Sequence, residues 1–241
     1  MRHSILAVIP VLALAALGMA ACDDGDTTEP RETASVRFVN AVSGASGNLI
    51  LTANDDAVGS ALAFGSFSNA CALVDAGDDI DLAFGTANTG GTGIASTLGT
   101  STVDLATGGN FTIVAAGTAA NPQLFVLNNT TTAPTGSNAA LRFISTVPGT
   151  DAFDVFLSSN GTTLTTPIAT NLTFGGTGSG FVTLPAGTGT LVFTDAGTTD
   201  VALTVPSTTT LTAGQVGTVL LAPNAAGTGF QTINLSGCPT T

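Results

Sequence analysis

Short apolar runs separated by polar turns recur along the chain from residue 34 onward. The runs are rich in Val, Ile, Phe, Leu and Thr, and Gly, Asn, Asp or Pro stands at their boundaries. Runs of this kind are typical of β-strands, and none of them shows the sustained period of an amphipathic helix. Examples are residues 153–157, 180–184, 190–193, 201–205 and 217–221. The pattern therefore predicts an all-β fold of antiparallel β-sandwiches.

The same motifs occur twice in the same order. Residues 35–39 read Ser-Val-Arg-Phe-Val and residues 140–144 read Ala-Leu-Arg-Phe-Ile, so one arginine occupies the same position in each copy. Later matches pair residues 63–65 with 173–175, and Leu127 with Ile233. An internal repeat indicates the number of domains more firmly than chain length does. Two tandem sandwiches are therefore expected.

The amino terminus has the pattern of a signal peptide. A short positive segment is followed by an apolar run at residues 5–17, which is shorter than the roughly 20 residues that span a bilayer. Residues 19–22 read Met-Ala-Ala-Cys and resemble the lipobox of bacterial lipoproteins, in which cleavage precedes a lipid-bearing cysteine. This resemblance predicts a membrane anchor through lipid on Cys22. The alternative is ordinary cleavage after a small residue, which would give a freely secreted protein.

These patterns together predict five segments. They are a signal peptide at 1–21, which is helical in the precursor, an acidic flexible tether at 22–33, a first β-sandwich at 34–129, a linker at 130–138, and a second β-sandwich with a C-terminal cysteine tail at 139–241.

Charge narrows the choice of partners. The chain has 16 carboxylates and four Arg, and loss of the signal peptide would remove Arg2, leaving three Arg and a net charge of −13. Binding to phosphates requires clustered Lys and Arg, so we expect no nucleic-acid partner. The 44% of hydrophobic residues nevertheless supplies enough apolar surface for a folded core.

Two cysteines remain once Cys22 carries lipid. Cys71 and Cys238 form an even pair, and an exported protein enters a compartment where disulfides persist. We therefore expect a bridge between them. The alternative is a pair of unbonded cysteines that pack as small apolar residues.

The side chains that most catalysis requires are missing. After the signal peptide there is no His and no Lys, which excludes Ser-His, Cys-His and Ser-Lys pairs, Schiff bases and His metal sites. We expect no enzyme and no cofactor. Asp75 and Asp195 each begin an Asp-Ala-Gly turn similar to those of aspartic proteases. However, Asp75 matches Pro185 in the repeat, so ordinary turn roles are favoured for both.

Four carboxylates lie within seven residues, at Asp75, Asp78, Asp79 and Asp81. Oxygen ligands at this density are a weak candidate for a Ca²⁺ site, although the spacing matches no EF-hand loop. Alternation along a strand would place Asp78 on the opposite face from Asp79 and Asp81. We therefore favour a solvated turn followed by a strand with an acidic outer face, and no metal.

Arg37 and Arg142 occupy the matching positions of the two copies. This equivalence predicts a structural task, such as pairing with a carboxylate or covering the sheet with the aliphatic stem.

The second copy resembles the opening of the bacterial domain of unknown function 4397 family. That family begins with an Arg-bearing strand, a loop that contains Pro, and an Asp that leads the second strand, and Arg142, Pro148 and Asp154 match these features. Its aromatic strand ending in a Pro-Ala-Gly turn is matched at residues 181–187, while the first copy is less similar. The resemblance implies Ig-like β-sandwich domains, often in tandem, on exported or surface proteins with no established activity.

These features predict a non-enzymatic lipoprotein of the cell envelope, on the periplasmic or surface face of the outer membrane. Its sandwiches would serve as a structural, spacer or adhesive module, with other envelope or surface proteins or glycans as partners. The alternative is a lipoprotein that binds a glycan or depends on Ca²⁺. The absence of Trp and Tyr counts against stacking on sugars. A remote alternative is an Asp-dependent hydrolase.

Overall fold

The structure is a computed structural model that describes residues 31–149, 151–176, 178–236 and 238. The predicted signal peptide, Cys22 and most of the acidic tether lie outside these residues. Within them the chain forms 17 strands, β1 to β17. No helix in the described part of the chain has both the length and the apolar character needed to cross a membrane.

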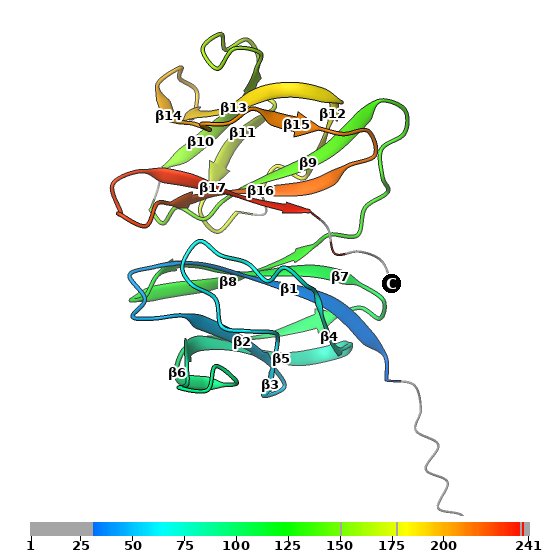
Figure 1. Ribbon diagram of the computed structural model, residues 1–241, viewed down its shortest axis with the longest axis vertical. Helices are drawn as coiled ribbons and strands as arrows, with labels where there is room; N and C mark the ends of the chain where they lie inside the picture. The colour runs from blue at the N-terminus through cyan, green and yellow to red at the C-terminus, as the bar shows by residue number, and fades with distance from the viewer. Residues whose placement is uncertain (1–30, 150, 177, 237, 239–241) are drawn as a thin grey trace, which may run out of the picture. The chain divides into compact units, whose positions relative to one another are not determined.

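The first sandwich packs two four-stranded sheets against each other (Figure 1). One sheet has the order β4 (Ala72–Asp75), β1 (Thr33–Ser43), β7 (Asn110–Thr118) and β8 (Asn121–Asn128). The other has the order β3 (Asp56–Ala57), β2 (Leu49–Ala53), β5 (Gly77–Ala87) and β6 (Ile94–Leu105). Phe38, Leu51 and Phe84 are fully buried in its core. Alternate residues of facing strands therefore fill the interior, as in other sandwiches.

The second sandwich repeats this arrangement. One sheet has the order β12 (Phe181–Pro185), β9 (Asn138–Ser145), β16 (Val216–Pro223) and β17 (Phe230–Ser236). The other has the order β11 (Ala169–Thr173), β10 (Ala152–Ser158), β13 (Gly187–Asp195) and β14 (Val201–Thr204), and β15 (Thr209–Leu211) also pairs with β13. Phe143, Phe153 and Phe193 fill the core. The predicted all-β fold of two tandem sandwiches is thus confirmed.

Two strand pairs differ from the antiparallel arrangement that the sequence predicts. β1 pairs with β7 in parallel, and β9 pairs with β16 in parallel. The remaining pairs among the named strands are antiparallel. Side chains alternate with a period of two in both kinds of pair, so the hydrophobic pattern does not reveal the direction of the neighbouring strand.

The strand register corrects one match between the copies. Leu127 lies opposite Thr112, and Thr112 lies opposite Arg37. In the second copy the residues at these positions are Leu235, Thr218 and Arg142. The counterpart of Leu127 is therefore Leu235 and not Ile233, because the turn before the last strand differs in length between the copies.

The sheets that contain β1 and β9 pack on each other as well as on their own cores. Apolar side chains from both sandwiches form one buried cluster here: Val39, Ala41, Val114, Ala116 and Leu127 from the first, and Ile144, Leu220, Ala222, Ile233 and Leu235 from the second. This contact, which we call the junction, covers the outer faces of the central strands β1, β7, β9 and β16. It explains why β1 and β9 are buried almost continuously and not at alternate residues.

Candidate functional site at the junction of the two sandwiches

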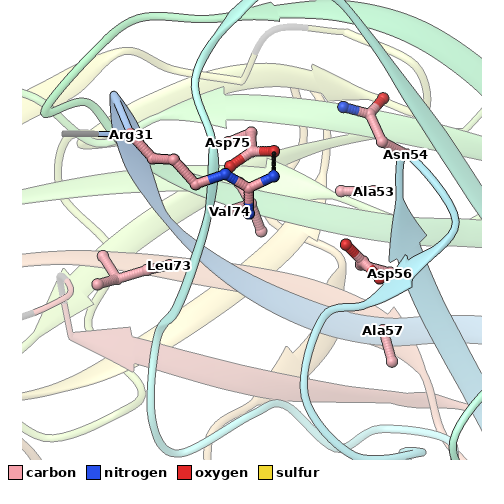
Figure 2. Close-up of a pocket in the computed structure, with 8 residues that line it drawn as sticks. All are labelled: Arg31, Ala53, Asn54, Asp56, Ala57, Leu73, Val74 and Asp75. Carbon is pink, nitrogen blue, oxygen red and sulfur yellow. Dashed lines mark ion pairs between the residues drawn. The ribbon is translucent and has the colours of Figure 1, made fainter. Parts of the chain in front are cut away.

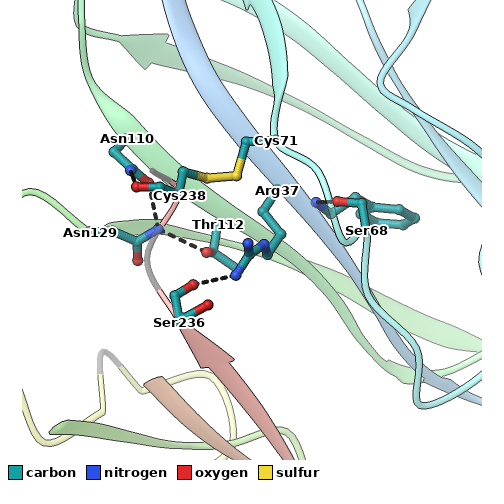
Figure 3. The surroundings of a disulfide bond; sticks show 9 residues. Arg37, Ser68, Cys71, Asn110, Thr112, Asn129, Ser236 and Cys238 are labelled. Atoms are coloured by element: carbon teal, nitrogen blue, oxygen red, sulfur yellow. Dashed lines mark hydrogen bonds between the residues drawn. A yellow bond between two sulfur atoms is a disulfide. The ribbon is translucent and has the colours of Figure 1, made fainter. Parts of the chain in front are cut away.

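A disulfide joins Cys71 to Cys238, which confirms the predicted bridge (Figure 3). The two Cα atoms are 5.9 Å apart, although the cysteines are separated by 167 residues in the sequence. Cys71 precedes β4 in the first sandwich and Cys238 follows β17 in the second, so the bond crosses the junction. The side-chain amide of Asn110 in β7 also donates a hydrogen bond to the carbonyl of Cys238 at 3.0 Å. Cys238 is thus held against the first sandwich.

Arg37 reaches across the junction from the first sandwich (Figure 3). It lies on β1, is 3% exposed, and donates from Nη1 to the carbonyl of Ser236, the last residue of β17. Its guanidinium also lies over the ring of Phe67, with Cζ 5.6 Å from the ring centroid. A buried cation is stabilised by both kinds of contact, since the carbonyl oxygen and the ring face carry partial negative charge.

Arg142 makes the corresponding contacts from the second sandwich. It lies on β9, is 6% exposed, and donates from Nη1 to the carbonyl of Asn128, the last residue of β8, at 2.9 Å. Its Nη2 donates to Oδ1 of Asn129 at 2.7 Å and to Oγ1 of Thr218 at 3.1 Å. Its Cζ lies 4.8 Å from the ring centroid of Phe181. Each arginine therefore binds the end of the last strand of the other sandwich.

Of the two structural tasks considered for these arginines, pairing with a carboxylate does not occur among the described residues. Among the described residues neither Arg37 nor Arg142 forms an ion pair, and the acceptors that they reach are neutral. Burial removes the guanidinium groups from water, which lowers the pKa of Arg142 to about 10 and lowers the pKa of Arg37 as well. A pKa of about 10 still leaves Arg142 charged at neutral pH. The charge of Arg142 therefore persists inside the junction, where its hydrogen-bond acceptors stabilise it.

A second reciprocal contact involves two glycines and two glutamines. Gly65 and Gly175 have φ angles of +75° and +77°, which favour glycine. A Cβ atom on Gly65 would lie 2.9 Å from Nε2 of Gln231 on β17, and one on Gly175 would lie 3.6 Å from Oε1 of Gln123 on β8. In each contact a glycine of one sandwich lies against a glutamine on the last strand of the other sandwich. Exchanging the two sandwiches converts one contact into the other. This exchange is the pattern of an isologous interface.

The structure does not gather the four aspartates considered for calcium into one cluster. Asp75 forms an ion pair with Arg31, and Asp81 accepts a hydrogen bond from Thr102 at 3.0 Å. No group of three or more His, Cys, Asp or Glu side chains placed to hold a metal occurs in the described part of the chain. The register of β5 against β6 shifts between Gly77 and Ile80, so the expected alternation fails and Asp78, Asp79 and Asp81 are all exposed.

A small cavity lies beside Asp75 (Figure 2). Its volume is about 90 Å³, and its wall includes the ion pair between Nη2 of Arg31 and Oδ2 of Asp75, at 3.2 Å. The arginine side chain is 76% exposed, and surface pairs of this kind contribute little to stability. Asp195 lies on β13 of the other sandwich. The structure therefore does not bring Asp75 and Asp195 together as an acid pair.

A family model matches residues 34–156, which is just over half of the chain. The model describes a domain of unknown function, DUF4397. The chain belongs to the DUF4397 family. The matched part contains all strands of the first sandwich except the first residue of β1, together with all of β9 and most of β10. A comparison with curated proteins finds none that matches the chain.

Sequence reasoning identified the paired arginines of this DUF4397 protein but missed their partners. Asn128 and Ser236 are ordinary polar residues, and their importance comes from ending equivalent strands. Phe67 lies in the loop between β3 and β4, whereas Phe181 lies in β12. The two aromatic residues therefore do not occupy matching positions in the two copies. The sequence signal for this site was the arginine that recurs at the same position in both copies. Its acceptors become visible only when the strand register is known.

Proposed function

We propose that this protein is a non-enzymatic lipoprotein of the cell envelope, held to the outer membrane by lipid on Cys22. Its two sandwiches act there as one rigid module, with a structural, spacer or adhesive task on the periplasmic or surface face. The Met-Ala-Ala-Cys motif at residues 19–22 supports the anchor. The absence of His and Lys after the signal peptide supports a task without catalysis.

The observation that carries the rigid module is the double crossing of the junction. The linker leaves the first sandwich after Asn128, where Arg142 binds. Beyond Ser236, to which Arg37 donates, Cys238 of the second sandwich's C-terminal side forms the disulfide with Cys71. A single linker allows two domains to rotate, whereas two covalent crossings around a buried apolar contact remove that hinge. A spacer needs this property to keep a fixed length.

Intact-mass analysis of the protein extracted from its native membrane tests the anchor. We expect the mass of residues 22–241 plus a diacylglycerol group and an N-linked acyl chain, and a gain of two hydrogen atoms on reduction. The matched variant Cys22→Ala should lack the lipid and leave the membrane fraction while keeping its disulfide. A mature mass without lipid in the wild-type protein would refute the anchored function.

A further inference from the structure

The second sandwich has a hollow of about 400 Å³, lined by strands β15, β16 and β17 and by the loop before β15. This volume lies within the usual range of ligand sites. Five buried apolar side chains line its inner part: Leu141, Val205, Leu211, Val219 and Leu235. The rest of its wall consists of Ser, Thr, Asn, Gln and Gly residues, and no charged side chain lines it. The hollow therefore suits an uncharged ligand with an apolar body.

The first sandwich shows which group fits in this place. Leu141 lies opposite Gly217 in the register of β9 and β16. Val36 lies opposite Phe111 in the matching register of β1 and β7, so Phe111 is the counterpart of Gly217. The side chain of Phe111 is 5% exposed and packs in the first core. The second copy thus has no side chain at the position where the first copy places a phenyl ring.

The residue two positions earlier differs together with this one. In the first copy it is Gly109, and a Cβ atom there would overlap Cε2 of Phe111. In the second copy it is Gln215, whose Oε1 accepts a hydrogen bond from the N–H of Thr212 at 2.9 Å. The amide of Gln215 lines the hollow, where it can bond to polar groups of a ligand. The second copy has therefore exchanged a ring for an apolar hollow with a polar group beside it.

Two strands that border the hollow each have an edge without a partner strand among the described residues. β15 pairs with β13 alone, and β17 pairs with β16 alone (Figure 1). Edge strands present backbone N–H and C=O groups that can bind an extended peptide. A peptide therefore fits this hollow better than a small aromatic molecule, which would use the apolar wall only.

We propose that this hollow binds the phenylalanine side chain of an extended peptide segment from a partner protein. The ring takes the place that Phe111 occupies in the first sandwich and packs on Leu141 and Leu211. The inference deepens the adhesive form of the proposed function by naming the partner's chemistry, and it rests on that function for the presence of a partner. The hollow itself does not depend on lipid at Cys22.

An NMR titration of the isotope-labelled full chain, with its disulfide intact, tests this hollow. Nα-acetyl-phenylalanine methylamide should produce saturable shifts of the amides of Leu211, Gly217 and Leu235. The alanine analogue, which has the same backbone but no ring, should produce none. Toluene, which has the ring but no backbone, should bind more weakly than the phenylalanine probe. The amides of Leu105 and Phe111 should not shift, because the first sandwich fills this place with its own ring.

A double variant, Gln215→Gly/Gly217→Phe, transplants the pair of residues found in the first sandwich. It should weaken binding of the phenylalanine probe at least about tenfold, because its own ring fills the hollow. A Cβ atom on Gly217 would lie 3.1 Å from Cδ2 of Leu141, so this side chain must shift slightly. The amide spectrum of the variant shows whether it folds.

A second variant leaves the core unchanged. Thr210→Asp adds a charge to the exposed rim of the hollow and should weaken binding about threefold, since the ligand would cover this charge. The charge-matched control Thr228→Asp, in the exposed turn before β17 and outside the wall, should bind as the wild type does.

Four results would overturn the proposal: no saturable shift with the phenylalanine probe, equal binding of the alanine analogue, equal or tighter binding of toluene, or undiminished binding by Thr210→Asp. Undiminished binding by a folded double variant would do so as well. These outcomes are separate from those of the lipid measurement, since a protein with no lipid at Cys22 could still bind the probe. A lipidated protein could equally fail to bind it.

Discussion

Arg37 and Arg142 show how a charged residue can serve a buried interface without an opposite charge. Each guanidinium binds a strand-end carbonyl of the other sandwich and lies over an aromatic ring. Removal of Arg142 would leave the buried hydroxyl of Thr218 without this donor, which costs more than the hydrogen bond itself contributes. The two arginines therefore define the position of one sandwich on the other.

Replacement of Arg142 should be far more damaging than replacement of an exposed arginine. We expect Arg142→Ala to lower the free energy of unfolding by about 3 kcal/mol, because the acceptors at Asn128, Asn129 and Thr218 lose their donor. The control Arg31→Ala removes a largely exposed ion pair and should change stability by less than about 1 kcal/mol. Urea unfolding of both variants measures the difference. Equal, small losses would mean that the buried arginine does not stabilise the junction.

At the scale of strands, the sequence predicts local structure well and pairing poorly. The run at residues 153–157 lies in β10, and the run at 217–221 lies in β16, because apolar runs bounded by turns determine strands locally. The parallel pairing of β1 with β7 depends on contacts between residues far apart in the chain. Burial of β1 on both faces was also invisible, since it requires the second sandwich to be in place.

The attachment of Cys238, which follows β17, to the first sandwich can be tested by removing its disulfide. The double variant Cys71→Ser/Cys238→Ser removes this bond, and we expect the free energy of unfolding to fall by about 5 kcal/mol. The reason is that the bridge closes a loop of more than 160 residues and so restricts the unfolded chain. Urea unfolding with and without reductant provides the measurement and its control. Reductant should destabilise the wild type by a similar amount and leave the variant unchanged. A wild type that is insensitive to reductant would argue against the bridge.

At the scale of the whole molecule, family and fold class followed from the sequence, whereas the junction did not. The match at residues 34–156 agrees with motifs such as the strand at 140–144, which short patterns can reveal. The junction depends on Leu127 and Leu235 facing each other's sandwich, and apolar residues look alike whether they fill a core or an interface. A tandem repeat read from sequence alone is equally compatible with two independent domains.

The central claim is that the two sandwiches behave as one body. Differential scanning calorimetry of the full chain with its disulfide intact tests this claim most directly. Because the junction is buried and crossed twice, we predict a single transition whose calorimetric enthalpy equals its van't Hoff enthalpy. Two transitions, or a calorimetric enthalpy about twice the van't Hoff value, would show that the sandwiches unfold independently and would contradict the account.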